Sequence, residues 1–194
     1  MGTLGFGLEA RWDTPVRWFD VRFGINRFSY DESRQYSGVG YDAVLDLDNF
    51  YLTGNFSSPA SPFRLTLGAV ANGNELQLLS HDAGDQTIEI DGTDFPVAKV
   101  GRLASTTSYA SIAPYAGVGL DFEVLGDVSV NFDVGVLWHG APTVTLEATN
   151  WDDLTAPEQA LLGPALDAER AGLEDEISEF DAYPVVSLTL LYNF

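Results

Sequence analysis

Two histidines, His81 and His139, are the imidazole groups from which this chain could build a hydrolytic site. Nucleophilic hydrolysis needs a serine within reach of a histidine that a carboxylate orients. His139 ends a predicted strand, but the neighbouring positions on the same strand face, 137 and 141, hold leucine and alanine. His81 lies in a predicted loop. We therefore expect both histidines to be polar rim residues and expect the chain not to be an enzyme.

Paired carboxylates offer a second kind of chemistry, because calcium binds carboxylate oxygens. Asp46 and Asp48 form the sequence DLD, and Asp91 and Asp94 lie in DGTDF. Neither segment has the DxDxDG spacing with a closing glutamate that a calcium loop needs. The chain also has no cysteine for a thiolate site. We expect no metal and no cofactor, and we interpret residues 91 to 95 as a β-hairpin turn.

A third set of residues consists of carboxylates and guanidinium groups that are often two positions apart, a spacing that places both on one face of a strand. If the strands form a barrel, this face lines its lumen. The predicted lumen residues, which would form a solute path, are Glu9, Arg11, Asp20, Arg22, Asp46, Asp48, Arg64, Asp121, Glu123 and Asp133. Two interpretations stay open: a buried network of ion pairs, or an acid-rich path that selects cationic solutes.

Most apolar segments alternate with period two, which is typical of strands with one apolar and one polar face. The predicted strands cover about residues 3–12, 16–28, 41–56, 63–72, 111–124, 128–140 and 183–194. Within 41–56 the apolar phase changes, from Leu45 and Leu47 to Phe50 and Leu52. A β-bulge near Asn49 would explain that change.

The connections between these strands alternate in length. Residues 13–15, 57–62 and 125–127 are short, whereas 29–40, 73–107 and 141–182 are long. This alternation is typical of membrane barrels with short periplasmic turns and long extracellular loops. In the second long loop, residues 75–80 and 86–100 predict a β-hairpin. In the third, Thr155 and Glu158 predict a capping box before a helix at about 156–179, broken at Gly163–Pro164.

A soluble lipocalin would show the same alternation, with its apolar face turned inward around a ligand. Three features favour lipid on the apolar side: the polar face is rich in glycine and in both signs of charge, the connections alternate in length, and aromatic residues mark strand ends. The predicted membrane-interface anchors are Trp12, Trp18, Trp138, Tyr192 and Phe194. We predict an all-β fold, a single antiparallel up-and-down transmembrane β-barrel over residues 1–194, in the bacterial outer membrane.

Four segments carry a family resemblance: YDAVLDLDNFYLTGNF (41–56), IAPYAGVGLDFEV (112–124), VGVLWHGAPTVTLEAT (134–149) and YPVVSLTLLYNF (183–194). They resemble the CarO-like family of small eight-stranded outer-membrane barrels, which includes a carbapenem-associated ornithine-uptake porin. The ending LLYNF also resembles the C-terminal signal that the barrel-assembly machinery of Gram-negative bacteria reads. The resemblance implies an eight-stranded barrel, porin-like uptake of small solutes such as cationic amino acids, and Phe194 as a contact of the assembly machinery.

The predicted strands number seven, whereas single-chain bacterial barrels usually have an even number. If the last strand runs towards the periplasm, counting backwards makes residues 3–12 a descending strand as well. We therefore expect an ascending first strand ahead of Met1.

The net charge of −20, from 9 Lys+Arg and 29 Asp+Glu, leaves too little positive charge for nucleic acid. Residues 141–182 hold eleven acidic residues and one basic residue. We expect these acidic loops to be hydrated, to reach lipopolysaccharide through divalent cations, or to concentrate a small cationic solute. The predicted function is porin-like passage of small solutes. The alternative is a structural or adhesive barrel with a plugged lumen and no transport.

Overall fold

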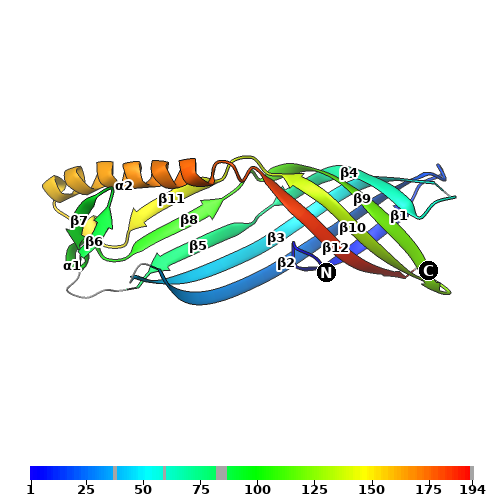
Figure 1. The fold of residues 1–194 in the computed structure, drawn as a ribbon, viewed down its shortest axis with the longest axis horizontal. Coiled ribbons are helices and arrows are strands. Elements are labelled where there is room, and N and C mark those ends of the chain that lie inside the picture. The colour runs from blue at the N-terminus through cyan, green and yellow to red at the C-terminus, as the bar shows by residue number, and fades with distance from the viewer. Residues whose placement is uncertain (37–38, 59, 82–86, 193–194) are drawn as a thin grey trace.

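A computed structural model describes residues 1–36, 39–58, 60–81 and 87–192 of the chain. The molecule is elongated, with a barrel at one end and a sheet extension that carries a long helix at the other (Figure 1). The barrel strands are β1 (Phe6–Asp13), β2 (Phe19–Tyr36), β3 (Val39–Ser57), β4 (Phe63–Asn72), β9 (Ile112–Leu125), β10 (Val128–Trp138) and β12 (Ala182–Tyr192). Short turns connect these strands at what we call the lower end, and the extension rises from the upper end.

The barrel wall follows the order β1-β2-β3-β4-β9-β10-β12, and every neighbouring pair is antiparallel. The seven strands predicted from alternation are therefore all present in the described residues. Met1 and Leu188 exchange two backbone hydrogen bonds of 2.8 and 2.9 Å, so residues 1–3 lie antiparallel to β12. The chain then turns at Thr3–Leu4 into β1.

The long connections are largely structured rather than loop-like. β3 pairs with β4 along its lower part and with β5 (Glu75–Ser80) along its upper part. β8 (Leu103–Ser108) and β11 (Thr143–Ala148) then continue the same sheet. The segment predicted as loop 29–40 mostly belongs to β2 and β3, which extend beyond the barrel (Figure 1).

The predicted pairing of residues 75–80 with 86–100 is wrong, because β5 pairs with β3 and β8 instead. A separate hairpin joins β6 (Thr87–Ile90) to β7 (Thr93–Pro96). Its turn at Asp91 and Gly92 has φ of 47° and 70°, as a two-residue hairpin turn with positive φ at both positions requires. The interpretation of residues 91 to 95 as a hairpin turn is confirmed.

The predicted bulge near Asn49 is also wrong, because β2 and β3 pair in unbroken register from Phe19↔Phe56 to Tyr36↔Val39. The same face of β3 points inward along the whole strand, but the residue types on its two faces differ between the lower and the upper part. Below Asn49 the outward residues Phe50 and Leu52 are exposed and apolar. Above it the outward Asp48 forms an exposed ion pair with Arg27. The apolar residues move from one face of β3 to the other because the environment of each face changes along the strand, and the strand pairing itself stays regular.

An asparagine row marks this change of character. Asn26, Asn49 and Asn72 lie opposite one another on β2, β3 and β4. Asn49 is buried and donates to Asn74 at 2.6 Å, and Asn72 donates to the Ala110 carbonyl at 3.3 Å. Amides suit this level because they bond to one another and to backbone groups without adding charge.

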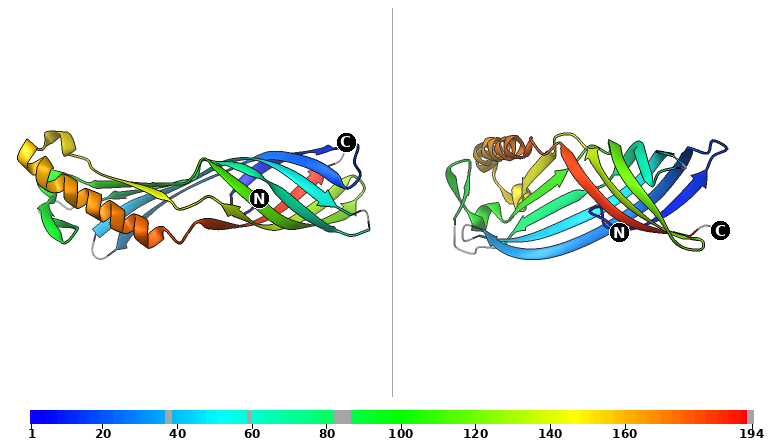
Figure 2. Two further views of the ribbon diagram at one scale, coloured as in Figure 1. Left: turned by 90° about the horizontal axis from the view of Figure 1, so that it is seen from above. Right: turned by 45° about the vertical axis from the view of Figure 1, so that its right-hand side comes forward.

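The extension carries α1 (Val97–Val100), the 3₁₀ turn η1 (Trp151–Asp153) and α2 (Ala156–Ile177), which lies along the extension (Figure 2). α2 runs unbroken through Gly163–Pro164, contrary to the prediction. Leu162 and Leu166, on either side of Pro164, are buried against Ile88, Ile90 and other residues of the β6–β7 hairpin and α1. This packing offsets the hydrogen bond that proline removes from the helix.

The capping box at the start of α2 is present and ties the helix to α1. The Glu158 carboxylate accepts hydrogen bonds from the Thr155 N–H at 3.0 Å and from its hydroxyl at 2.7 Å, and it also binds Lys99. These hydrogen bonds, chiefly that from Lys99, lower the pKa of Glu158 to about 2. A lowered pKa stabilises the folded form above the unfolded pKa, and this stabilisation is lost as the pH falls towards 2.

We expect Glu158→Gln to weaken the docking of the first turn of α2 at neutral pH. Hydrogen exchange of amides 156–160 should accelerate in the variant, and the difference from the parent protein should disappear as the pH approaches 2. Glu176→Gln, an exposed change of the same kind, is the control and should leave these amides protected. Unchanged exchange in Glu158→Gln at pH 7 would show that the capping carboxylate does not hold this turn.

Candidate lumen site

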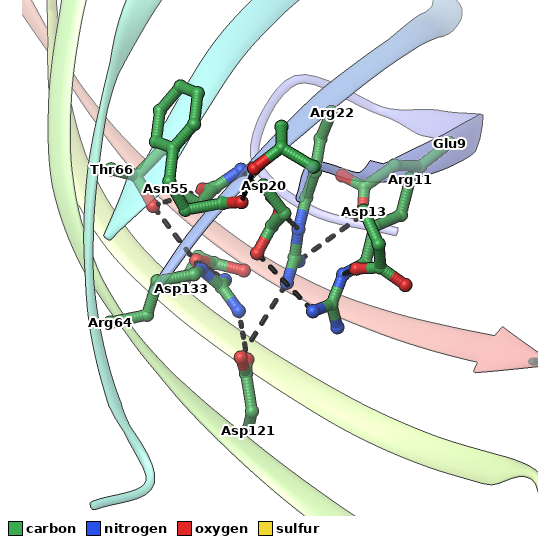
Figure 3. A network of polar contacts seen from close by, with 12 residues as sticks. Glu9, Arg11, Asp13, Asp20, Arg22, Asn55, Arg64, Thr66, Asp121 and Asp133 are labelled. Atoms are coloured by element: carbon green, nitrogen blue, oxygen red, sulfur yellow. Dashed lines mark hydrogen bonds and ion pairs between the residues drawn. The ribbon is translucent and has the colours of Figure 1, made fainter. Parts of the chain in front are cut away.

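Arg22 organises the first half of a polar network inside the lower barrel. The residue is 2% exposed, and its Nε donates to Asp20 at 3.2 Å. Nη1 donates to Glu9 on β1 at 3.3 Å, and Nη2 lies 3.6 Å from Asp121 on β9 (Figure 3). One guanidinium group therefore joins three strands of the wall. Its fork of N–H groups suits this role, because it presents several donors in one plane.

Arg64 organises the second half from β4. Its guanidinium binds Asp121 on β9 and Asp133 on β10, and its Nε lies 3.4 Å from the Thr66 hydroxyl (Figure 3). Asp121 is thus shared by both arginines. The two guanidinium groups link β1, β2, β4, β9 and β10 through a single continuous chain of charges.

Neutral side chains that were not predicted from the sequence complete the network. Asn55 donates to Asp20 at 3.1 Å and accepts from Thr66 at 2.8 Å. The Tyr51 hydroxyl donates to Glu9 at 2.8 Å. In the amide orientation that satisfies its neighbours, Asn131 donates to Asp121 and accepts from Arg22. Their positions on the strands could have identified them. Asn131 and Thr66 lie two positions from Asp133 and Arg64 and so share a strand face with them, and Asn55 lies opposite Asp20 on the neighbouring strand.

The structure brings together most of the predicted charged residues. Glu9, Arg11, Asp20, Arg22, Arg64, Asp121 and Asp133 all take part in the network, with Arg11 at its rim beside Asp13 and Asp20. Glu123 lies on the same face as Asp121 but is exposed near the lower end of β9.

The predicted lumen positions of Asp46 and Asp48 are wrong. Both lie on the outward face of the extension, where Asp48 pairs with Arg27 at 3.0 Å. They were misplaced because the prediction inverted the faces above Asn49, where the inward side chains are Leu45 and Leu47. Acidic groups on this part of β3 therefore face water rather than the lumen.

Four of the predicted interface anchors are exposed aromatic residues on the outer surface: Trp12, Trp18, Trp138 and Tyr192. Trp18 stacks on Phe56 with ring centroids 6.0 Å apart. Trp12, Trp18 and Tyr192 lie near the lower end, and Trp138 ends β10 at the upper end. Phe194 lies outside the described residues. The role of all five as anchors stays a prediction.

An apolar layer covers the network on its upper side. It consists of the buried residues Leu4, Val70, Ala113, Leu137 and Val185, with Tyr51, Tyr115 and Tyr183 packed against them. Glycines on the inner wall make room for the tyrosine rings: a Cβ on Gly135 would lie 2.4 Å from the Tyr115 hydroxyl, and one on Gly24 would lie 2.4 Å from that of Tyr51. Glycine-rich strands are thus a packing requirement of this lumen.

A cavity of about 460 Å³ opens inside the barrel between the network and the apolar layer. Its lining combines two carboxylates and two guanidinium groups of the network with tyrosine rings and inward residues of β12: Glu9, Asp133, Arg22, Arg64, Tyr51, Tyr115 and Ser187. We call this space the lumen cavity. Charged groups of both signs, tyrosine rings and small polar groups therefore meet around one partly open volume.

The histidines lie outside this site. His81 Nε2 is 2.8 Å from Asp42 in the extension, where hydrogen bonds from Ser33 and His81 lower the pKa of Asp42. His139 packs edge-on against Tyr109. The described ranges of the chain contain no group of three or more metal-ligating residues that could hold an ion. Within the same ranges, no helix is both long and apolar enough to cross a membrane.

The network makes Arg64 a strong stability determinant. Removing a partner from a buried ion pair costs about 3–5 kcal/mol of unfolding free energy, whereas an exposed pair contributes about 0–1 kcal/mol. We expect Arg64→Met to cost several-fold more than the same change at Arg27, which pairs with Asp48 in the open. Adding Asp133→Asn to Arg64→Met should recover part of the loss. Equal costs at positions 64 and 27 in urea unfolding would contradict a stabilising network.

No protein-family model matches the sequence, and no curated protein sequence matches it. Solved structures do. CarO2 of Acinetobacter baumannii aligns over 100% of this chain and 94% of its own, with a TM-score of 0.61 and 24% identity. CarO of the same organism aligns over 100% and 94%, with a TM-score of 0.60 and 22% identity. The sequence-based expectation of an antiparallel all-β barrel is confirmed, and this chain has the fold of the CarO barrels.

Proposed function

We propose that this protein is a bacterial outer-membrane barrel that passes small solutes and favours cationic ones such as basic amino acids. The observation that carries the proposal is the acid-rich network beside the lumen cavity. The network joins five carboxylates to three guanidinium groups, which leaves a formal excess of two negative charges: Glu9, Asp13, Asp20, Asp121 and Asp133 with Arg11, Arg22 and Arg64. Such an excess favours a cation over an anion in a narrow passage.

The outer surface supports a membrane setting. Below the asparagine row the outward side chains are large, apolar and exposed, as at Phe23, Ile25, Leu52 and Leu65. Contiguous exposed apolar surface of this kind is typical of lipid-facing barrel walls. Above the row the outward Arg27 and Asp48 form an exposed ion pair. In this setting the extension lies outside the cell.

The remaining proposed partners follow from the same placement. The acidic extension and α2 would meet lipopolysaccharide through divalent cations, because both surfaces are negative. The assembly machinery would bind the C-terminal segment that ends in Phe194. The proposal concerns passage of solutes and assigns the chain no catalytic role.

The apolar layer favours the alternative, a structural or adhesive barrel with a plugged lumen. Ala113 and Leu137 are fully buried, and Val70 is 3% exposed, and this close packing supports a plugged lumen. In a plugged barrel, passage would require this layer to move. A barrel of few strands is only wide enough to be filled by its own side chains.

Uptake of ornithine against glutamate into liposomes separates the two functions. We expect ornithine to enter faster, and we expect Asp121→Asn with Asp133→Asn to reduce the ornithine preference. Leu137→Ala should raise the flux of both solutes by thinning the apolar layer, whereas the outward Leu67→Ala should leave the flux unchanged. Background entry of both solutes, even in Leu137→Ala, would favour the plugged barrel. Equal entry above background would reject cation selectivity.

A further inference from the structure

A second cavity, of about 300 Å³, lies above the apolar layer where the barrel meets the extension. We call it the upper cavity. Its main side chains are Phe28, Leu45, Leu47, Tyr109, His139 and Tyr183. They come from β2, β3, the segment before β9, the end of β10 and the start of β12. The upper cavity and the lumen cavity share only Gly2 and Gly5 among their described linings, with the apolar layer between them.

His139 supplies the upper cavity with a hydrogen-bond acceptor. The residue is 6% exposed, and its Nδ1 lies 2.8 Å from the Gly140 carbonyl oxygen. A carbonyl oxygen only accepts, so Nδ1 carries the proton and Nε2 of the neutral ring holds a free lone pair. Within the described part of the chain, Nε2 has no hydrogen-bond partner. Nε2 is therefore an accessible acceptor on the lining of the upper cavity.

The ring of His139 is held in place rather than free to turn away. Its backbone N–H donates to the Asp181 carbonyl at 3.1 Å, and its carbonyl accepts from Ala110 N–H at 3.3 Å. The Tyr109 ring packs edge-on against the imidazole, with the two ring centroids 4.4 Å apart. The acceptor is therefore preorganised, which reduces the entropy that a bound solute must offset.

The composition of the upper cavity indicates the kind of solute it would hold. Its described lining is mostly aromatic and aliphatic, with the neutral polar side chains of Thr3 and Asn74, and it contains no carboxylate and no basic side chain besides the imidazole of His139. An ammonium group would find no counter-charge there, and a carboxylate would find no cationic donor. A cavity of about 150 Å³ already accepts benzene. The upper cavity, at about 300 Å³, has room for a ring that carries a substituent.

We propose that the upper cavity binds a small neutral aromatic solute with one hydrogen-bond donor, such as a phenol. The ring would pack among Phe28, Leu47 and Tyr109, and the hydroxyl would donate to Nε2 of His139. This site is independent of passage through the lumen. It would act even in a plugged barrel, because it lies on the outer side of the apolar layer.

The chain is well suited to a direct test, because His81 and His139 are its only histidines. In lipid nanodiscs with ¹⁵N-labelled histidine, we expect phenol to shift the Nε2 resonance of His139 and leave that of His81 unchanged. Toluene, which has the same shape without the donor, should bind roughly 2–10-fold more weakly, the usual worth of one hydrogen bond. Equal binding of phenol and toluene, no response of His139, or tighter binding of butylammonium would overturn the proposal.

Two variants separate loss of the acceptor from loss of the fold. His139→Asn keeps a donor for the Gly140 carbonyl but removes the group at the Nε2 position. It should still bind toluene and should lose the preference for phenol. His139→Gln places an amide oxygen near the Nε2 position and should retain that preference. If His139→Asn still prefers phenol over toluene, the acceptor role of Nε2 is wrong.

Discussion

On each of the long strands β2 and β3, one face is polar and the other is apolar. At the level of Asn49 the polar side chains change from the inward face to the outward face. Below this residue the outward side is apolar and the inward side carries the charged network. Above it Leu45 and Leu47 turn inward to the upper cavity, while Asp48 and Arg27 face outward. One unbroken register achieves both arrangements, because successive side chains of a strand always alternate. The rest of the structure depends on this exchange.

The charged network follows from the narrowness of the barrel. Charges inside so small a space must pair, since a buried unpaired charge is costly. Arg22 and Arg64 satisfy this requirement through carboxylates of four strands, and Gly119 on β9 leaves room for Arg64. A Cβ on Gly119 would lie 2.5 Å from both Arg64 and Asp133. The apolar layer then separates this polar space from the upper cavity.

Much of the barrel could be predicted from alternation, because period two fixes which residues share a face. Glu9, Arg22, Arg64 and Asp133 were predicted on this basis to share the polar face, and all four belong to the charged network. The prediction was wrong above Asn49. Asp46 and Asp48 were assigned to the inward face because polar side chains were assumed to face the lumen along the whole strand. Val70 and Leu137 share the parity of the charged residues and could have revealed the apolar layer. The pairing of β5 with β3 and β8 joins distant segments, which local patterns do not encode.

The exchange at Asn49 can be measured directly, since the chain has no cysteine and accepts single spin labels without background. In lipid bilayers, labels at 50 and 52 should be accessible to oxygen, and labels at 46 and 48 should be accessible to a water-soluble nickel reagent. The boundary should fall within two residues on β3 and at the matching height, between Ile25 and Arg27, on β2. Oxygen accessibility that continues through position 46, or nickel accessibility at position 52, would contradict the proposed membrane level and the account built on it.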